Sequence, residues 1–329
     1  MLLLSKQDIQ NVFSMKEAIT ATRQAFQIVA EEKFDAPLRT VIPVAEEEGS
    51  LLFMPGYVPE LQSAALKVVS IFPNNAKKNL PTAPAQVLLL DAKTGIITAM
   101  LDGTYITQLR TGAASGAALD ALAKKDCVTG ALIGTGSQSA CQLEALLAIR
   151  MLKEVRVAGR DYDRTRAFTE RMKKELQPEG TAIVPVASGD DAVRDADLIV
   201  AVTSSTTPVF DGNLVKKGAT VSGVGSYQHH MQELDPVLLS RADKIFFDSE
   251  EAVLSESGDI LQPLENGTLR KEDFNGDIGH VFSEQTPGRE NDDEIIVFKT
   301  VGVAPQDLIT ARAIVEKAEA EGIGTVWEE

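Results

Sequence analysis

Between residues 128 and 299 the chain alternates short apolar runs with helical segments, and this alternation restricts the fold more than any other feature of the sequence. Strands that alternate with helices in this way build parallel sheets that carry helices on both faces. The sequence therefore predicts an α/β fold with a doubly wound parallel sheet of the Rossmann type. The expected strands span residues 128–133, 154–157, 182–186, 198–202, 219–224, 244–247 and 295–299.

The preceding part of the chain has a different pattern. Four short apolar runs, which Pro and Gly interrupt, lie at residues 41–44, 51–54, 66–71 and 86–90. Residues 92–95 predict a hairpin turn between strands. The first helix is expected to begin after Ser14, because Ser14 and Glu17 have the spacing of a capping box. We expect a second, α+β domain with a mainly antiparallel sheet.

The last helical segment indicates how the two parts are organised. Pro305 stands at an N1-like position and opens a helix whose apolar residues lie on one side. We expect this helix to pack on the first part of the chain, which makes that part discontinuous. A chain of 329 residues has the length of two domains. We predict one domain from residues 1–115 plus 303–329 and another from residues 116–302, the latter entered through a helix of small residues at 115–124.

Charge and composition exclude several classes of protein. The net charge of −16 repels phosphate backbones and anionic bilayers, so we expect no nucleic-acid partner and no membrane partner. A small anionic substrate remains compatible, because a few local Arg and Lys residues override the global field. Only two cysteines are present, and no apolar run approaches the roughly 18 residues of a membrane span. We therefore expect a cytoplasmic protein.

A glycine-containing turn follows the first strand of the alternating region. It reads Gly134-Thr135-Gly136-Ser137-Gln138-Ser139 and precedes a helix from about residue 140. Gly134 permits a tight turn, Gly136 lets the backbone approach a pyrophosphate, and the helix N-terminus offers N–H groups to that anion. Ser139 replaces the third Gly or Ala of the fingerprint, but it is small enough for close helix–strand packing. The pattern predicts a dinucleotide site; the alternative is a glycine-rich turn without a ligand.

The residues after the next strand bear on the choice of cofactor. An acidic residue at the end of that strand would bind the ribose 2′-hydroxyl of NAD. Here Gly159 takes that position and Arg160 follows it, with Arg164 nearby. An Arg at this point suits a 2′-phosphate through charge-assisted hydrogen bonds. We therefore favour NADP over NAD; in the alternative, Arg160 is a solvated turn residue and Asp161 binds the ribose.

Three cations in the first part of the chain are unusual in so acidic a protein. Arg39 begins an apolar run, Lys67 lies inside the run at residues 65–71, and Arg110 is expected at the start of a helix. The alternative interpretation is that each is a surface charge. This interpretation fits Lys67 least, because its neighbours in the sequence are apolar. A partly desolvated Lys has a depressed pKa and exchanges protons near neutral pH. Arg39 and Arg110 would fork a carboxylate, and Thr82, between two prolines, would be a rigid hydroxyl donor.

The histidines and cysteines argue against other chemistries. His229 and His230 are adjacent, so in an extended segment their side chains point in opposite directions. His280 has no His or Cys at ligand spacing, and no Cys-x-x-Cys pair occurs, which makes a zinc site improbable. No Gly-x-Ser-x-Gly elbow is present either. We expect no bound metal.

Taken together, these residues resemble the ornithine cyclodeaminase/μ-crystallin family. The resemblance runs across nearly the whole chain, and the block around Arg110 is its most specific part. The matching elements are Arg39, Leu66-Lys67-Val68-Val69, Leu80-Pro81-Thr82, residues 88–95, residues 107–116, Gly134-Thr135-Gly136, residues 196–199, Gly223-Val224-Gly225-Ser226 and residues 293–299.

The resemblance implies a homodimer in which the N-terminal substrate-binding domains pair, and a Rossmann domain that binds NAD(P). It also implies that Arg39, Lys67 and Arg110 hold a substrate carboxylate, and that the lysine transfers a proton. Members of the family include ornithine cyclodeaminases, reductases of cyclic ketimines and of Δ1-pyrroline-2-carboxylate, alanine dehydrogenases and opine-type dehydrogenases.

One position departs from the cyclodeaminase pattern. Ornithine cyclodeaminases carry an Asp two residues beyond the glycine that matches Gly225, whereas this chain has Tyr227. A phenol with a pKa near 10 cannot serve as that anionic base at neutral pH. Ornithine cyclisation is therefore disfavoured, while hydride transfer is not affected.

Our leading hypothesis is an NAD(P)H-dependent reductase of a small imine that bears a carboxylate, with Δ1-pyrroline-2-carboxylate, giving L-proline, as the preferred example. The alternatives are an ornithine cyclodeaminase that retains its NAD, an alanine or opine-type dehydrogenase, and a non-catalytic NADPH-binding protein like μ-crystallin. Lys67 is the expected catalytic residue, and the substrate is expected to be bound by Arg39, Lys67, Thr82 and Arg110. The residues expected to bind the cofactor are Thr111, Gly134, Thr135, Gly136, Ser137, Gln138, Gly159, Arg160, Asp161, Arg164, Thr203, Ser204, Val224, Gly225, Ser226 and Lys299.

Overall fold

The computed structural model describes residues 1–37, 39–78 and 80–328, and the chain in it divides into two compact units. Unit 1 comprises Met1–Arg110 and Val303–Glu329, and unit 2 comprises Thr111–Gly302. The first division falls inside a long helix, a few residues before the boundary expected after residue 115. The second division lies between Gly302 and Val303.

Unit 1 is built on a seven-stranded sheet with the order β14-β1-β6-β5-β4-β3-β2. Neighbouring strands are antiparallel except β1 and β6, which are parallel, so the mainly antiparallel sheet is confirmed. The strands are β1 (Leu2–Leu4), β2 (Thr40–Val44), β3 (Gly49–Val58), β4 (Ser63–Ile71), β5 (Ala85–Asp91), β6 (Ile97–Asp102) and β14 (Thr325–Val326).

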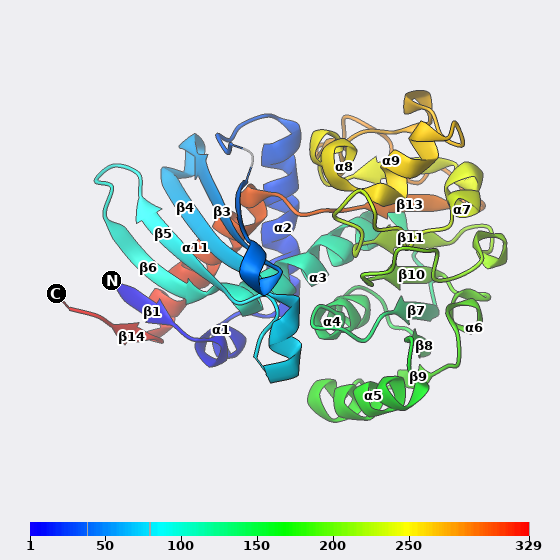
Figure 1. The fold of residues 1–329 in the computed structure, drawn as a ribbon, viewed down its shortest axis with the longest axis horizontal. Coiled ribbons are helices and arrows are strands. Elements are labelled where there is room, and N and C mark those ends of the chain that lie inside the picture. The colour runs from blue at the N-terminus through cyan, green and yellow to red at the C-terminus, as the bar shows by residue number, and fades with distance from the viewer. Residues whose placement is uncertain (38, 79, 329) are drawn as a thin grey trace. The chain divides into compact units, whose positions relative to one another are not determined.

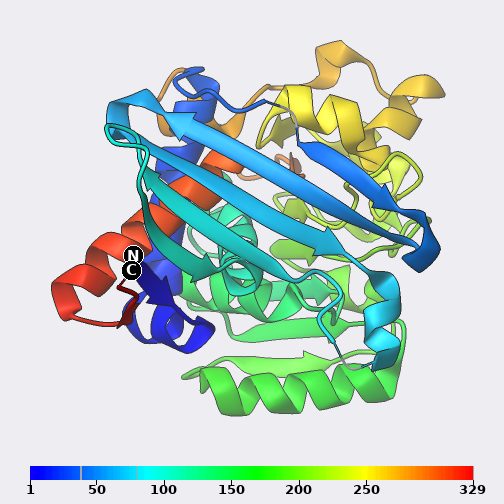
Figure 2. The same ribbon diagram turned by 60° about the vertical axis from the view of Figure 1, so that its left-hand side comes forward.

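The helices of unit 1 are α1 (Lys6–Val12), α2 (Met15–Ala30) and α11 (Ala304–Glu321). Helix α2 begins with the expected capping box of Ser14 and Glu17. It is not the first helix, however, because Ser5 and Asp8 form a second box that starts α1. Helix α11 packs on α2 and on strands β3, β4 and β5. Figure 2 shows the long strands of this sheet with α2 and α11 along one face.

The two faces of this sheet differ in burial. Along β4, Ala65, Lys67 and Val69 are buried, while the residues between them are only half-buried. The register places Phe53 of β3 opposite Val68 and Leu66 opposite Leu88 of β5. These half-buried side chains form an apolar sheet face, which we define by Leu51, Phe53, Leu66, Val68 and Leu88.

Unit 2 contains a seven-stranded sheet with the order β12-β13-β11-β10-β7-β8-β9, in which all pairs are parallel. Figure 1 shows β13, β11, β10, β7, β8 and β9 in this order. Each expected strand is present, with ends within one residue of the prediction. They are β7 (Thr129–Ile133), β8 (Glu154–Ala158), β9 (Ala182–Pro185), β10 (Leu198–Ala201), β11 (Thr220–Gly223), β12 (Lys244–Phe247) and β13 (Ile296–Lys299).

Helices cover both faces of this sheet, as the prediction of a doubly wound fold requires. Ile199 of β10 belongs to one apolar cluster, while its neighbours Leu198 and Val200 belong to another. The helices of this region are α3 (Gly103–Leu122), α4 (Ser139–Ile149), α5 (Tyr162–Leu176), α6 (Gly189–Val193), α7 (Pro236–Arg241), α8 (Glu250–Glu256), α9 (Gly258–Glu265) and α10 (Ile278–Phe282). Within the residues described, no helix has the length and apolar character needed to cross a bilayer.

Helix α3 corrects one expectation about the candidate site. Arg110 was expected at the start of a helix, but α3 begins at Gly103, so Arg110 lies well inside it. Asp102 caps the helix by accepting a hydrogen bond of 2.7 Å from the N–H of Tyr105. The helix is buried on nearly all sides, with Ile106 and Ala113 both fully inaccessible. It therefore lacks the one-sided apolar period that marks a helix in sequence.

Candidate active site

A buried cluster of charges in unit 1 contains two of the cations that the sequence singled out. Lys67 comes from β4, Arg110 from α3, and Asp307 from the first turn of α11. The Nζ atom of Lys67 lies 2.5 Å from Oδ2 of Asp307, and Nε of Arg110 lies 3.3 Å from Oδ1. All three residues are at most 7% exposed. Two cations therefore share one carboxylate in a water-poor environment.

The strand register explains why Lys67 is buried. Successive side chains of a strand point to opposite faces, so Lys67 shares the inward face of β4 with Ala65 and Val69. Its neighbours across the ladder are Met54 of β3 and Val87 of β5, which are buried apolar side chains. These neighbours cannot solvate an ammonium group, so the charge depends on the carboxylate of α11.

The electrostatics follow from this placement. Burial lowers the pKa of Lys67 to about 8; Asp307 opposes the shift, and Arg110 and Arg39 add to it. Burial also acts to raise the pKa of Asp307, but Lys67 and Arg110 hold it below its ordinary value. The cluster keeps an excess of positive charge, which suits an anionic ligand.

The other two residues expected to bind the substrate are also in unit 1. Arg39 is half-buried just before β2, and its charge acts on Lys67. The structure thus brings Arg39, Lys67 and Arg110 into one electrostatic group. Thr82 is half-buried before β5, and its carbonyl oxygen accepts a hydrogen bond of 2.8 Å from the N–H of Phe72. A role for the Thr82 hydroxyl stays a prediction.

The glycine turn of unit 2 has the features of an anion site. Gly134 has φ +121°, and a Cβ there would lie 2.5 Å from the carbonyl oxygen of Val202. A Cβ at Gly136 would meet nothing within 4 Å among the residues described, so packing does not require this glycine. Gln138 precedes α4, and in the described part of the chain its side chain makes no cap to that helix. The N–H groups of the first turn of α4 thus remain suited to a pyrophosphate.

The end of β8 has no room for an acidic side chain at Gly159. A Cβ there would lie 2.6 Å from Oγ1 of Thr165 and 3.1 Å from Oγ1 of Thr135. Asp161 instead caps α5, accepting a hydrogen bond of 2.9 Å from the N–H of Arg164. The side chain of Arg160 is exposed. The position after β8 where NAD-binding folds carry an acidic residue is therefore closed to such a side chain.

A second buried network, which the sequence did not reveal, holds the loops after β10 and β11. The carboxylate of Glu233 accepts hydrogen bonds from the N–H and Oγ1 of Thr203, at 2.6 and 2.9 Å, and from the N–H groups of Val224 and Gly225, at 2.9 and 2.5 Å. A Cβ at Gly225 would lie 1.8 Å from the carbonyl oxygen of Thr203, so the two loops are in direct contact.

Asp259 and Lys299 complete this network. Oδ1 of Asp259 accepts hydrogen bonds of 2.7 and 2.9 Å from the N–H groups of Glu233 and Leu234, and Oδ2 lies 3.1 Å from Nζ of Lys299. Burial, followed by the charge of Asp259, raises the pKa of Glu233. Lys299 and Ser226 were expected to bind the cofactor; both are fully buried, and Ser226 Oγ donates to the carbonyl oxygen of Met231. Their side chains act within the protein.

Four more of the expected cofactor residues follow the carboxyl ends of β7 and β10, whereas Thr111 lies inside α3. The sheet order changes direction between β7 and β10, which is where nucleotides bind in doubly wound sheets. Ser137 and Ser204 are exposed there, and Thr135 and Thr203 are half-buried. Thr111 is buried, and its carbonyl oxygen accepts a hydrogen bond of 3.0 Å from Nε2 of Gln142.

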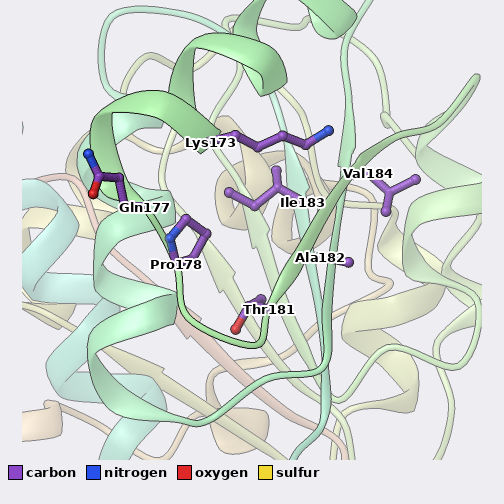
Figure 3. Close-up of a pocket in the computed structure, with 7 residues that line it drawn as sticks. All are labelled: Lys173, Gln177, Pro178, Thr181, Ala182, Ile183 and Val184. Carbon is purple, nitrogen blue, oxygen red and sulfur yellow. The ribbon is translucent and has the colours of Figure 1, made fainter.

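Other features of unit 2 add no second site. His229 is exposed, and its Nε2 atom lies 2.8 Å from Oε1 of Glu265. Among the residues described, no group of three or more His, Cys, Asp or Glu side chains is arranged to hold a metal ion. A shallow hollow lies between the end of α5, the following loop and β9, and Figure 3 shows its seven lining side chains. Of these seven, Lys173 alone is charged, and none is an expected site residue.

The chain belongs to the ornithine cyclodeaminase/mu-crystallin family, whose model matches residues 1–322. A Δ1-pyrroline-2-carboxylate reductase of Bacillus cereus is 36% identical over 324 residues, which cover 98% of each chain. The structure of Thermococcus litoralis Δ1-pyrroline-2-carboxylate reductase in complex with NADH and L-proline has a TM-score of 0.93 and 38% identity, covering 99% of this chain and 100% of that one. An archaeal alanine dehydrogenase dimer with bound NAD has a TM-score of 0.89 and 30% identity, covering 100% and 99%.

Proposed function

We propose that the protein reduces the C=N bond of Δ1-pyrroline-2-carboxylate to give L-proline, with a reduced nicotinamide cofactor as electron donor. The observation that carries this proposal is the buried cluster in which Lys67 and Arg110 share the single carboxylate of Asp307. Its surplus of positive charge suits a carboxylate substrate. The relatives support the same activity, since the Bacillus cereus and Thermococcus litoralis proteins are reductases of this imine. The chain is an oxidoreductase.

The two guanidinium groups bind and orient the substrate in this proposal. Arg110 meets Asp307 through Nε, so its terminal nitrogens are not used by that contact and serve the forked geometry that a carboxylate needs. Arg39 supplies the second guanidinium. A carboxylate held at two points fixes the plane of the adjoining C=N group, which reduces the entropic part of the barrier.

Lys67 transfers the proton that the reduction requires. When bound, the reduced nicotinamide supplies a hydride to the imine carbon. The ammonium group of Lys67 donates a proton to the imine nitrogen, which becomes the amine of the product. Because the pKa of Lys67 is about 8, the side chain is mainly protonated at neutral pH and acts as an acid; above that pH it becomes a neutral base suited to the reverse reaction.

Unit 2 binds the cofactor, and we assign NADPH as the preferred form. The turn from Gly134 to Gln138 would receive the pyrophosphate, and Thr203, Ser204 and the backbone of Gly225 would contact the riboses. The preference for a 2′-phosphate is supported by the closed space at Gly159 and by the exposed side chain of Arg160. The solved relatives contain NADH or NAD, so this preference would be a property of this chain.

The protein forms a homodimer through the apolar sheet face of unit 1. A face with the aromatic ring of Phe53 among half-buried Leu and Val side chains is typical of a protein–protein interface. The archaeal alanine dehydrogenase relative is a dimer. We expect Phe53→Glu to convert the dimer to a monomer in size-exclusion chromatography with light scattering. Val237→Glu, at an exposed position of α7, is the control. A wild-type protein that elutes as a monomer contradicts this assignment.

The decisive experiment measures cofactor oxidation and product together. We expect purified protein to oxidise NADPH when Δ1-pyrroline-2-carboxylate is added and to form an equal amount of L-proline. Pyruvate with ammonia tests the alanine dehydrogenase activity, and L-ornithine without reduced cofactor tests cyclisation. Tyr227, which takes the place of the cyclodeaminase Asp, predicts no ammonia release from ornithine. Ammonia release from ornithine with no NADPH oxidation by the imine would overturn the proposal.

A further inference from the structure

Asp307 is unusual in a site that is to hold a carboxylate. Its side chain is 3% exposed, and it takes one contact from Lys67 and one from Arg110. An internal carboxylate competes with the substrate for the cations that bind it, so it weakens binding. A carboxylate retained at that cost is expected to contribute something to the reaction itself.

The groups around Lys67 show what this contribution is. Burial disfavours an ammonium group at Lys67 most strongly, and Arg110 of α3 and Arg39, before β2, repel it further. The cross-strand neighbours Met54 and Val87 are apolar. Asp307 of α11 is the group that stabilises the ammonium, and its Oδ2 atom also fixes the position of Nζ at 2.5 Å. The charge and the aim of Lys67 thus depend on one side chain.

We propose that Asp307 is a positioning residue that acts through Lys67, keeping its Nζ atom protonated and aimed so that it serves as the acid in imine reduction. This inference rests on the proposed function. In the step, a Lys67 N–H bond breaks and its proton forms the new N–H bond with the electron pair of the C=N π bond. The hydride completes the new C–H bond as the imine is reduced and the nicotinamide oxidised. Neutral Lys67 then regains a proton from solvent.

The test compares pH profiles of wild type and Asp307→Asn, which has nearly the same shape without the charge. In wild type, kcat/KM for reduction is expected to fall above pH 8, about tenfold per pH unit, as Lys67 loses its proton. Removal of the carboxylate moves this loss to lower pH. The ratio of variant to wild-type kcat/KM is therefore expected to be at least about tenfold higher at pH 6 than at pH 8. A ratio that is constant from pH 6 to pH 9 overturns the inference, because a structural defect acts at all pH values.

A conservative variant provides the matched control. Asp307→Glu keeps the charge and shifts it by one methylene. Its kcat/KM is therefore expected to fall above nearly the same pH as in wild type, even where its rate is lower. Circular dichroism and NADPH binding by fluorescence report whether each variant is folded. If Asp307→Asn does not fold, the test rests on Asp307→Glu. This variant retains the negative charge, so a fall of its kcat/KM that begins at a clearly lower pH than in wild type contradicts the assigned role.

A binding measurement separates this inference from the proposed function. Pyrrole-2-carboxylate, a planar five-membered ring with a carboxylate, probes the cluster by calorimetry without turnover. Its affinity is expected to fall above pH 8 in wild type and from a pH at least one unit lower in Asp307→Asn. If both proteins bind the probe in this way but wild type does not reduce the imine, the proposed function fails, while the control of the Lys67 charge by Asp307 stands. Identical pH dependence in both proteins overturns the inference, whatever the activity.

Discussion

The two units each bury a cluster of three charged side chains, and the two clusters have opposite compositions. In unit 1, Lys67 and Arg110 share one carboxylate. In unit 2, the ammonium group of Lys299 pairs with Asp259, and its charge also acts on Glu233. The surplus charge is positive in the first cluster and negative in the second.

The hydrogen bonds that each cluster makes with the rest of the protein indicate what the cluster does. In unit 2 the carboxylate of Glu233 accepts four hydrogen bonds from two loops, and Asp259 accepts two more from backbone N–H groups. The carboxylates of that cluster are thus hydrogen-bonded by groups of the protein itself, and they fix the conformation of the two loops. In unit 1, Lys67 and Arg110 both contact the single carboxylate of Asp307, and in the proposed function the substrate carboxylate balances the remaining positive charge.

The largest effect is expected when the first cluster loses its acid. Lys67→Met should lower kcat for imine reduction by about 10³-fold, because a positioned general acid contributes roughly 10²–10⁴-fold. The Kd for NADPH, measured by fluorescence, should change less than about twofold, since Lys67 is in unit 1. Lys93→Met, at an exposed turn between β5 and β6, is the control. A variant at position 67 with near-normal turnover would show that the cluster has no acid role.

An intermediate effect, on stability instead of rate, is expected when the second cluster loses a carboxylate. Asp259→Asn removes the carboxylate that pairs directly with the buried ammonium of Lys299, and breaking a buried pair costs about 3–5 kcal/mol. Urea denaturation measures this change in the free energy of unfolding. Asp163→Asn, which breaks an exposed pair with Arg166, should cost less than about 1 kcal/mol. If both variants lose the same free energy of unfolding, the buried pair of Asp259 stabilises the protein no more than the exposed pair of Asp163, and the prediction is wrong.

The smallest effect is expected for an exposed cation of unit 2, Arg160. Arg160→Ala should weaken NADPH binding about tenfold, the value of one charge-assisted contact, and leave NADH binding within about twofold. Arg171→Ala, on the exposed side of α5, is the control. Titration of both cofactors by fluorescence measures the ratio. An equal change for NADPH and NADH would reject the preference for NADPH.

The sheet of unit 2 was predictable because its strands are buried on both faces. Such strands are continuous apolar runs, and their ends fall where the runs end. Helix α3 was harder, because a helix buried on all sides lacks an amphipathic period; its cap at Asp102 was the available indication. Helix α1 has only seven residues, although Ser5 and Asp8 show the spacing of its capping box. Strands β1 and β14 are shorter still, and only their pairing identifies them.

The candidate site was predictable only in part. The cations Lys67 and Arg110 stand out in sequence because their neighbours are apolar or small. Asp307 does not, because an acidic residue in the first turn of a helix is ordinarily explained by the helix dipole. Glu233 and Asp259 are equally ordinary in sequence. Their roles depend on partners that the fold brings together, and Asp307 lies 240 residues from Lys67.

That separation has a consequence for biosynthesis. Ribosomes release the chain from its N-terminus, and compact units fold as they emerge. Unit 2 is one continuous stretch, whereas unit 1 needs Val303–Glu329, which are translated after all of unit 2. A growing chain therefore finishes its second unit before its first. Until α11 emerges, Lys67 and Arg110 lack the counter-ion that Asp307 supplies, so this cluster is assembled only after unit 2 has been translated.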